Sequence, residues 1–353
     1  MNVIQSLIAT GTIALVSFTS LPIAMSEPVN PAPVTVDSSA SMVELPASFQ
    51  PGLNRVIFQS EGERMVGNLY LPTSYQPGDK LPVIVVTGAW TTVKEQMPAV
   101  YAQRLADRGF ATFTFDFRYW GESGGTPRQY ESPVAKVQDI KNAVAFLQTL
   151  PVIDSDRIGG LGICASAGYM AQAVAADSSF KSFATVAAWL HDLDALNALF
   201  GEETVQRRMN LGRAARKQFD RTGEVEYVPA YSQNDSNAAM TGDVSYYGSR
   251  DRGVIPAWTN RFAVMSWHEW QGFDAMAIAP QITTPTLMVH SDGSALPDNA
   301  REFYAALSGK KQLVWAEGQH LDFYDRDPQV STAVNALVTH FQTTLSHSTS
   351  TQN

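Results

Sequence analysis

The chain has 353 residues, of which 25 are Lys or Arg and 34 are Asp or Glu, so its formal net charge is −9. Hydrophobic residues make up 44% and charged residues 17%, a composition typical of packed globular proteins rather than of disordered chains. The acidic balance, without a Lys/Arg tract, argues against nucleic-acid binding. The single cysteine, Cys164, excludes an internal disulfide and a cysteine-rich zinc site.

Residues 1–26 predict a signal peptide. They contain no charged side chain, their centre is an apolar run from Leu7 to Val16, and Ala24 and Ser26 are small residues suited to cleavage near Ser26. A retained membrane anchor is the alternative, because the segment approaches the roughly 20 residues that a spanning helix needs. Export with cleavage predicts a secreted or periplasmic protein without stable membrane insertion.

The remaining chain divides by composition. Prolines punctuate residues 27–48, which we expect to form a linker without a fold of its own, and residues 347–353 form a polar, flexible tail. Between them we expect a core built from residues 49–189 and 281–346. The intervening residues 190–280 are too many for a bare loop in a compact domain, so we expect them to form a mainly helical cap inserted into the core.

Apolar runs and helical spacings alternate through the core. Segments on either side of Glu61-Gly62-Glu63 predict an antiparallel hairpin, and the apolar run Leu81–Thr87 predicts a strand that is covered on both faces. Strands that alternate with helices predict an α/β fold, with a mostly parallel central sheet and helices on both faces. The further strands expected are 110–117, 157–163, 182–189, 285–289 and 312–315, and the helices expected are 99–108, 133–150, 169–176, 298–307 and 328–345.

The residues around Cys164 have the spacing of a nucleophile elbow. Gly162 precedes the cysteine by two residues and Ser166 follows it by two, as expected of a strained strand-to-helix turn that leaves no room for large side chains. The start of the following helix favours the reactive thiolate. Ser166 is an alternative nucleophile. In that register Cys164 occupies the position two residues before the nucleophile, where the motif has glycine. The further alternative is an inert, buried cysteine.

A thiol nucleophile needs a base, and the base needs an orienting acid. Among the six histidines, His320 follows the last expected strand, at the sheet edge where sites of this architecture assemble. Asp292 comes directly after another strand and is favoured as the acid over Asp298, which has the position of a helix N-cap. The sequence therefore predicts Cys164, Asp292 and His320 as the catalytic residues.

Chemistry on an acyl group also needs donors for the developing oxyanion. The backbone N–H of Ala165 follows the nucleophile, and a second donor is expected from Ala89 or Trp90. Trp90, Trp267 and His268 are candidates for binding substrate, although aromatic residues in a cap also form its core. We expect neither a metal nor a cofactor.

Together these segments resemble the α/β-hydrolase superfamily. The cysteine-centred elbow is similar to the dienelactone-hydrolase-like branch, and the whole pattern is similar to its polyketide-transferase-like bacterial members. The resemblance implies an α/β-hydrolase fold and a Cys-Asp-His triad that acts on ester or thioester carbonyls. The chain departs from the common pattern at Ser294, where most members carry the acid, and in its large cap. The segments that carry the resemblance are the opening hairpin, Thr87-Gly88, residues 115–125, the elbow, residues 289–292 and Gly318-Gln319-His320.

We therefore expect an exported hydrolase that cleaves a small-molecule acyl ester or thioester through an acyl-enzyme on Cys164. The alternatives are an acyltransferase that uses the same triad and a non-catalytic ligand-binding protein on the same fold. A peptidase is less expected, because amide cleavage demands more activation of the leaving group. The sequence specifies neither the substrate nor the oligomeric state.

Overall fold

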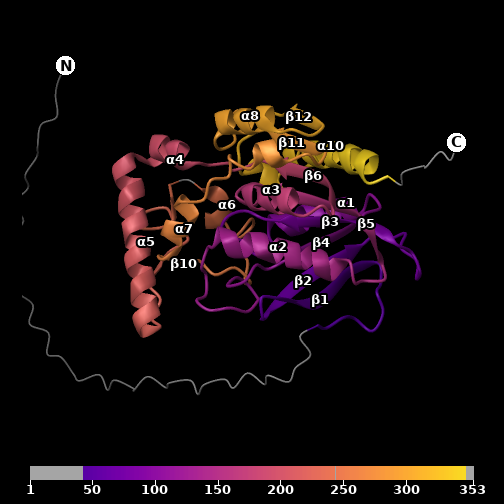
Figure 1. Cartoon of the computed structure of the whole chain (residues 1–353), viewed down its shortest axis with the longest axis horizontal. Coiled ribbons are helices and arrows are strands. Elements are labelled where there is room, and N and C mark those ends of the chain that lie inside the picture. The colour runs from indigo at the N-terminus through magenta and orange to yellow at the C-terminus, as the bar shows by residue number, and fades with distance from the viewer. Residues whose placement is uncertain (1–42, 243, 347–353) are drawn as a thin grey trace, which may run out of the picture. The chain divides into compact units, whose positions relative to one another are not determined.

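The computed structural model describes residues 43–242 and 244–346 (Figure 1). The expected signal peptide (residues 1–26), most of the expected linker (27–48) and the expected tail (347–353) lie outside these ranges. None of the described helices combines the length and the hydrophobicity that a transmembrane span requires.

An eight-stranded sheet runs through the described residues in the order β1-β2-β4-β3-β5-β6-β11-β12. β2 is antiparallel to both of its neighbours, and all pairs from β4 to β12 are parallel. The predicted mostly parallel sheet is confirmed. The strands are β1 (Gly52–Ser60), β2 (Glu63–Leu71), β3 (Leu81–Thr87), β4 (Ala111–Phe115), β5 (Ile153–Ile163), β6 (Phe180–Val186), β11 (Thr286–His290) and β12 (Lys311–Trp315).

Helices pack on both faces of this sheet. α1 (Met97–Ala106) packs against α10 (Gln329–Thr344), whereas α2 (Pro133–Leu147) packs against α3 (Ser166–Ala176) and against β1 and β5. Covering helices explain why the central strand β3 is a continuous apolar run, with every side chain from Val83 onward buried. α8 (Pro297–Ala306) and the single-turn α9 (Asp322–Asp325) complete this part of the fold.

The chain between β6 and β11 forms an insertion. Its longest helix, α5, buries only three of its 21 residues, and Figure 1 shows it at the left of the view with α7 beside it. A Cβ on Gly212 of α5 would lie 2.6 Å from the backbone nitrogen of His268 in α7, so the two helices pack closely. The elements of the insertion are α4 (Leu193–Phe200), α5 (Glu202–Thr222), β7 (Tyr227–Val228), β8 (Tyr231–Ser232), β9 (Met240–Thr241), α6 (Ser245–Gly248), β10 (Phe262–Ala263), α7 (Ser266–Gln271) and the 3₁₀ turn η1 (Ala279–Gln281).

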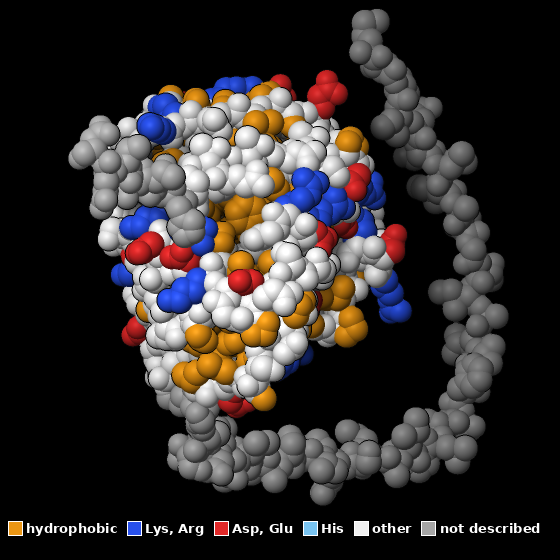
Figure 2. All heavy atoms as spheres, turned by 90° about the vertical axis from the view of Figure 1, so that its right-hand side faces the viewer, with side chains coloured by type: hydrophobic (Ala, Val, Ile, Leu, Met, Phe, Trp, Pro, Cys, Tyr) orange, Lys and Arg blue, Asp and Glu red, His pale blue; other side chains and the backbone are white. Residues whose placement is uncertain are grey.

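The surface mixes charges of both signs. On the face in Figure 2, basic and acidic side chains lie interspersed, with small groups of hydrophobic side chains between them. Leu193 and Leu199 of α4 are among the exposed large hydrophobic residues. Single exposed apolar residues are ordinary on globular proteins.

Three histidines are buried in their neutral form. Burial lowers the pKa of His191, His290 and His340 from 6.5 to about 4. In the unfolded chain these side chains bind protons below about pH 6.5, so their contribution to stability is full above that pH and is lost as the pH falls toward 4. Burial raises the pKa of Asp139 to about 6. Below that pH the folded protein takes up a proton that the unfolded chain does not, which stabilises the fold and offsets most of the loss from one histidine.

Desolvation also lowers the pKa of His320, to about 3. We therefore expect the free energy of unfolding to fall by about 4 to 7 kcal/mol between pH 7 and pH 5, measured by urea denaturation. His340 bonds to the hydroxyl of Ser182 and the carbonyl of Phe183. The substitution His340→Gln keeps polar groups there but removes the titration, and should reduce the fall by about 2 kcal/mol. A free energy that does not change between these pH values would contradict this account.

Candidate active site

Cys164 lies at the turn between β5 and α3, with its backbone in the left-handed region at φ 56°. This conformation is rare for a residue with a Cβ. The turn closes because Gly162 has no side chain: a Cβ there would lie 2.6 Å from both the Cα of Ala167 and the carbonyl oxygen of Ser166. The close approach that the sequence spacing predicted is therefore present at Gly162.

Ser166, the alternative nucleophile, does not reach the cavity that Cys164 lines. Its hydroxyl is fully buried and has no hydrogen-bond partner among the described residues. The sulfur of Cys164 forms part of the cavity wall. Of these two side chains, only Cys164 is placed where a substrate could meet it.

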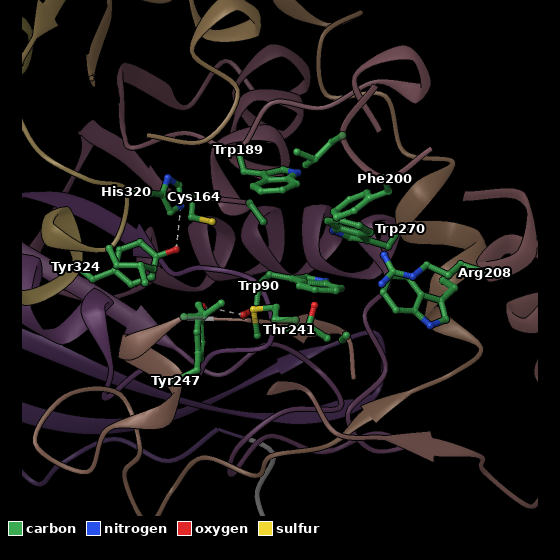
Figure 3. A pocket seen from close by; sticks show the side chains of 17 residues that line it. Trp90, Cys164, Trp189, Phe200, Arg208, Thr241, Tyr247, Trp270, His320 and Tyr324 are labelled. Atoms are coloured by element: carbon green, nitrogen blue, oxygen red, sulfur yellow. Dashed lines mark hydrogen bonds between the residues drawn. The ribbon is translucent and has the colours of Figure 1, made fainter. Parts of the chain in front are cut away.

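A cavity of about 300 Å³ lies at Cys164 (Figure 3). Its walls are largely aromatic, and the ring of Trp90 stacks on that of Trp270 with centroids 4.3 Å apart. The buried His191 accepts a hydrogen bond from the indole of Trp189 at 3.1 Å and bonds through Nε2 to the carbonyl of Trp270 at 2.9 Å, so it supports two walls at once. The aromatic residues that line the cavity are Trp90, Trp189, Phe200, Tyr247, Trp267, Trp270 and Tyr324.

Two backbone N–H groups, those of Ala165 and Trp90, lie beside the sulfur of Cys164 and act to lower its pKa. They are two of the three donors expected from the sequence. The N–H of Ala89 is instead directed to the sulfur of Met97 at 3.5 Å. The pair that could stabilise an oxyanion is therefore Trp90 and Ala165.

Residues of the insertion fix the loop that carries Trp90. The indole of Trp258 donates to the carbonyl of Thr91 at 2.8 Å, and the hydroxyl of Tyr247 donates to the carbonyl of Trp90 at 3.4 Å. Within the loop, the hydroxyl of Thr92 donates to the carbonyl of Ala89 at 2.6 Å. With their carbonyls bonded on one side, the loop residues present the Trp90 N–H to the cavity.

The hydroxyl of Tyr324 points toward His320, beside Cys164 (Figure 3). It acts to lower the pKa of the Cys164 thiol and lies 3.1 Å from Nε2 of His320. Nδ1 of His320 accepts the N–H of Ala295 at 3.1 Å, so the ring proton is on Nε2. In this arrangement Nε2 donates to the Tyr324 oxygen, and the Cys164 sulfur and the Tyr247 hydroxyl are the acceptors near the hydroxyl hydrogen of Tyr324.

Burial keeps the thiol and the imidazole uncharged. Desolvation raises the pKa of the Cys164 thiol, although the hydroxyl of Tyr324 and two backbone N–H groups act in the opposite direction. Desolvation, together with the neighbouring His290, lowers the pKa of His320 to about 3. At neutral pH the site therefore holds a thiol and a neutral histidine rather than a thiolate–imidazolium pair.

Asp292, the acid expected from the sequence, lies outside this chain of hydrogen bonds. Its carboxylate pairs with Arg301 of α8, and its side chain is 75% exposed. Arg301 also holds Asp298, at 2.9 Å. Among the described residues no hydrogen bond joins Asp292 to His320, because the nearby guanidinium takes the carboxylate and the Ala295 N–H occupies Nδ1. The expected Asp292–His320 contact is not formed in this structure.

Of the three residues expected to bind substrate, the structure places two at the cavity and one away from it. Trp90 and Trp267 line the cavity, whereas His268 is exposed on α7 and does not. The sequence reasoning missed Tyr324, whose only signal is its place four residues after His320.

Three carboxylates meet near the end of β4, those of Glu95, Asp116 and Glu122. The ammonium group of Lys94 lies among them, at 2.6 Å from Glu95, 2.8 Å from Asp116 and 2.6 Å from Glu122. Lys94 already supplies the positive charge that a cation would bring. This cluster is therefore an ion-pair network.

The sequence matches the X-Pro dipeptidyl-peptidase (S15) family over residues 61–322. The Pseudomonas aeruginosa protein PA2218 is 33% identical over 298 residues, which cover 80% of this chain and 78% of that protein. The Escherichia coli (strain K12) protein YcjY is 30% identical over 293 residues, 78% of this chain and 93% of that protein. A thiohydrolase from Eupenicillium brefeldianum is 24% identical over 257 residues, 68% of this chain and 80% of that enzyme.

Solved structures share the fold. The crystal structure of PA2218 gives a TM-score of 0.71 at 28% identity and covers 86% of this chain and 95% of that one. The α/β hydrolase GrgF from Penicillium sp. sh18 gives a TM-score of 0.69 at 18% identity and covers 83% of this chain and 99% of that one. The α/β-hydrolase fold that the sequence resembles is thereby confirmed. These relatives support a hydrolase, and the chain belongs to the X-Pro dipeptidyl-peptidase (S15) family.

Proposed function

We propose that the protein hydrolyses esters or thioesters of a small acyl group through an acyl-enzyme on Cys164, with His320 as the base and Tyr324 between them. The observation that carries this proposal is a single aromatic cavity that holds the sulfur, two backbone N–H groups beside it, and the hydroxyl of Tyr324, which lies 3.1 Å from Nε2 of His320. The similarity to a thiohydrolase supports the choice of substrate class.

In the acylation step the sulfur attacks the substrate carbonyl carbon while the thiol proton leaves through the Tyr324 hydroxyl to His320. Nε2 carries the ring proton at rest, so this ring proton must move to Nδ1 before Nε2 can accept the proton of the thiol. The move requires the hydrogen bond from the Ala295 N–H to Nδ1 to open. The carbonyl oxygen gains a negative charge, which the N–H groups of Trp90 and Ala165 stabilise.

The tetrahedral intermediate then collapses. The bond to the alcohol or thiol leaving group breaks, and that group takes the proton from His320. In deacylation a water molecule attacks the acyl carbon and gives one proton to His320. The bond from carbon to sulfur then breaks, and the sulfur takes that proton from His320 through the Tyr324 hydroxyl, which restores the thiol and the neutral histidine. Transfer of the acyl group to an alcohol or amine would use the same acyl-enzyme with another acceptor.

The peptidase activity in the family's name fits this cavity less well. A dipeptidyl-peptidase takes a substrate with a free N-terminal ammonium group, and a carboxylate is the natural partner for such a group. The described residues that line the cavity include a guanidinium and an imidazole but no carboxylate. An aminoacyl-proline anilide therefore serves as the comparison substrate in the tests below.

The first test removes the nucleophile. We expect Cys164→Ala to lower kcat/KM for p-nitrophenyl acetate and for acetyl and pentanoyl thioesters of N-acetylcysteamine by about 1,000-fold or more, because the substitution removes the atom that would carry the acyl group. Ser166→Ala is the matched control and should retain activity within about threefold. Undiminished turnover in Cys164→Ala, or turnover of the anilide alone, would reject the proposal.

The second test separates Tyr324 from Asp292. Tyr324→Phe removes a donor to the sulfur, so we expect the pH dependence of Cys164 alkylation by iodoacetamide to move to higher pH and kcat/KM to fall about 10- to 100-fold. Asp292→Asn should change kcat/KM by less than about threefold, because its exposed pair with Arg301 contributes little.

An unchanged alkylation profile in Tyr324→Phe would show that the hydroxyl does not act on the sulfur. A loss of about 100-fold or more in Asp292→Asn would instead establish the Cys-Asp-His triad and a rearranged loop at residues 291–296.

A further inference from the structure

A guanidinium without a counter-charge lines the same cavity as the nucleophile. Arg208 of α5 contributes to the wall, and Figure 3 shows it on the side of the cavity opposite His320 and Tyr324. Its Nη1 is buried and has no hydrogen-bond partner among the described residues. No ion pair joins Arg208 to any acidic side chain in the described part of the chain, although α5 carries three acidic residues.

Aromatic rings hold this guanidinium in place. Its central carbon lies 5.0 Å from the ring centre of Phe200 in α4 and 4.3 Å from that of Trp267 in α7. Ring faces attract a cation, but they do not accept the N–H hydrogens at the edge of the guanidinium plane. Arg208 is therefore fixed in orientation while part of its donor capacity is unused.

The surroundings favour an anion as the missing partner. α5 has six basic and three acidic residues in a chain whose net charge is −9, so a local positive charge stands within an acidic protein. A planar guanidinium matches a carboxylate, which accepts two parallel N–H bonds. Apart from Thr241 and the reacting end at Cys164 and His320, the rest of the lining is apolar or aromatic and suits a short methylene chain.

We infer that Arg208 binds a carboxylate at the far end of the acyl group, so that the preferred substrates are half-thioesters or half-esters of dicarboxylic acids. The inference rests on the proposed function for the reacting end of the substrate. The inference adds a specificity-determining residue, Arg208, and a substrate class to the proposed function.

The kinetic test compares matched acyl groups as thioesters of N-acetylcysteamine: succinyl with butanoyl, glutaryl with pentanoyl and adipyl with hexanoyl. We expect at least one dicarboxylic member to exceed its neutral counterpart in kcat/KM by about 10- to 100-fold in the wild-type protein. In Arg208→Met, which keeps an unbranched apolar chain between the rings, that ratio should fall to about one.

Arg207→Met is the matched control. Arg207 is the exposed neighbour on α5 and does not line this cavity, so the substitution removes the same charge and should leave the ratio as in the wild type. The inference would be overturned if the ratio of kcat/KM between the dicarboxylic thioester and its neutral counterpart were the same in the wild type, Arg208→Met and Arg207→Met. A preference for coenzyme A over N-acetylcysteamine thioesters that disappears in Arg208→Met would also overturn it, because Arg208 would then bind the leaving group.

A binding measurement keeps this inference separate from the proposed function. The non-hydrolysable 5-oxohexanoate and its neutral counterpart 2-hexanone can be titrated by the fluorescence of the cavity tryptophans. We expect 5-oxohexanoate to bind about 10-fold or more tightly than 2-hexanone in the wild type but not in Arg208→Met. If no thioester is turned over yet this difference is found, the proposed function fails and the anion site stands; equal affinities in the wild type would overturn the anion site.

Discussion

The left-handed backbone of Cys164 is the constraint on which the rest of the site depends. At φ 56° a residue with a Cβ costs about 1–2 kcal/mol, and the turn is closed by the contact between Gly162 and the start of α3. The same turn sets the sulfur among the N–H groups of Ala165 and Trp90 and the hydroxyl of Tyr324. Each step of the proposed chemistry is defined by its geometry relative to that sulfur.

The insertion between β6 and β11 determines the electrostatics of this sulfur. Its aromatic side chains close the cavity, and the resulting desolvation keeps the thiol protonated and His320 neutral. A neutral resting site needs a proton route, which the bridging hydroxyl of Tyr324 offers. The insertion also brings Arg208 into the largely apolar wall, so one segment supplies both the dry environment and a charge within it.

Strong local patterns made the fold and the sharp turn at Cys164 predictable. The apolar run of β3, the hairpin turn at Gly62 and the small residues around Cys164 each depend on contacts within a few residues of themselves. Contacts between distant segments could not be predicted. Asp292 could reach either Arg301 or His320 from its loop, and only the start of α8 decides between them.

The same limit applies to the donors and the cavity wall. The N–H of Ala89 meets Met97 rather than the substrate space, and a loop sequence does not fix that direction. Tyr324 lies on the single-turn helix α9, which has too few residues for a periodic signal. Arg208 is one of five arginines in α5, and only the packing of Phe200 and Trp267 distinguishes it from the others.

The central claim is that the acyl group is carried by the sulfur of Cys164. Intact-mass analysis after brief incubation with acyl thioesters, followed by peptide fragmentation, tests it most directly. We expect one acyl group per chain, located on Cys164, released by hydroxylamine and absent from Cys164→Ala. An acyl group on Ser166, or steady hydrolysis without any adduct on Cys164 under conditions that trap one, would contradict the account.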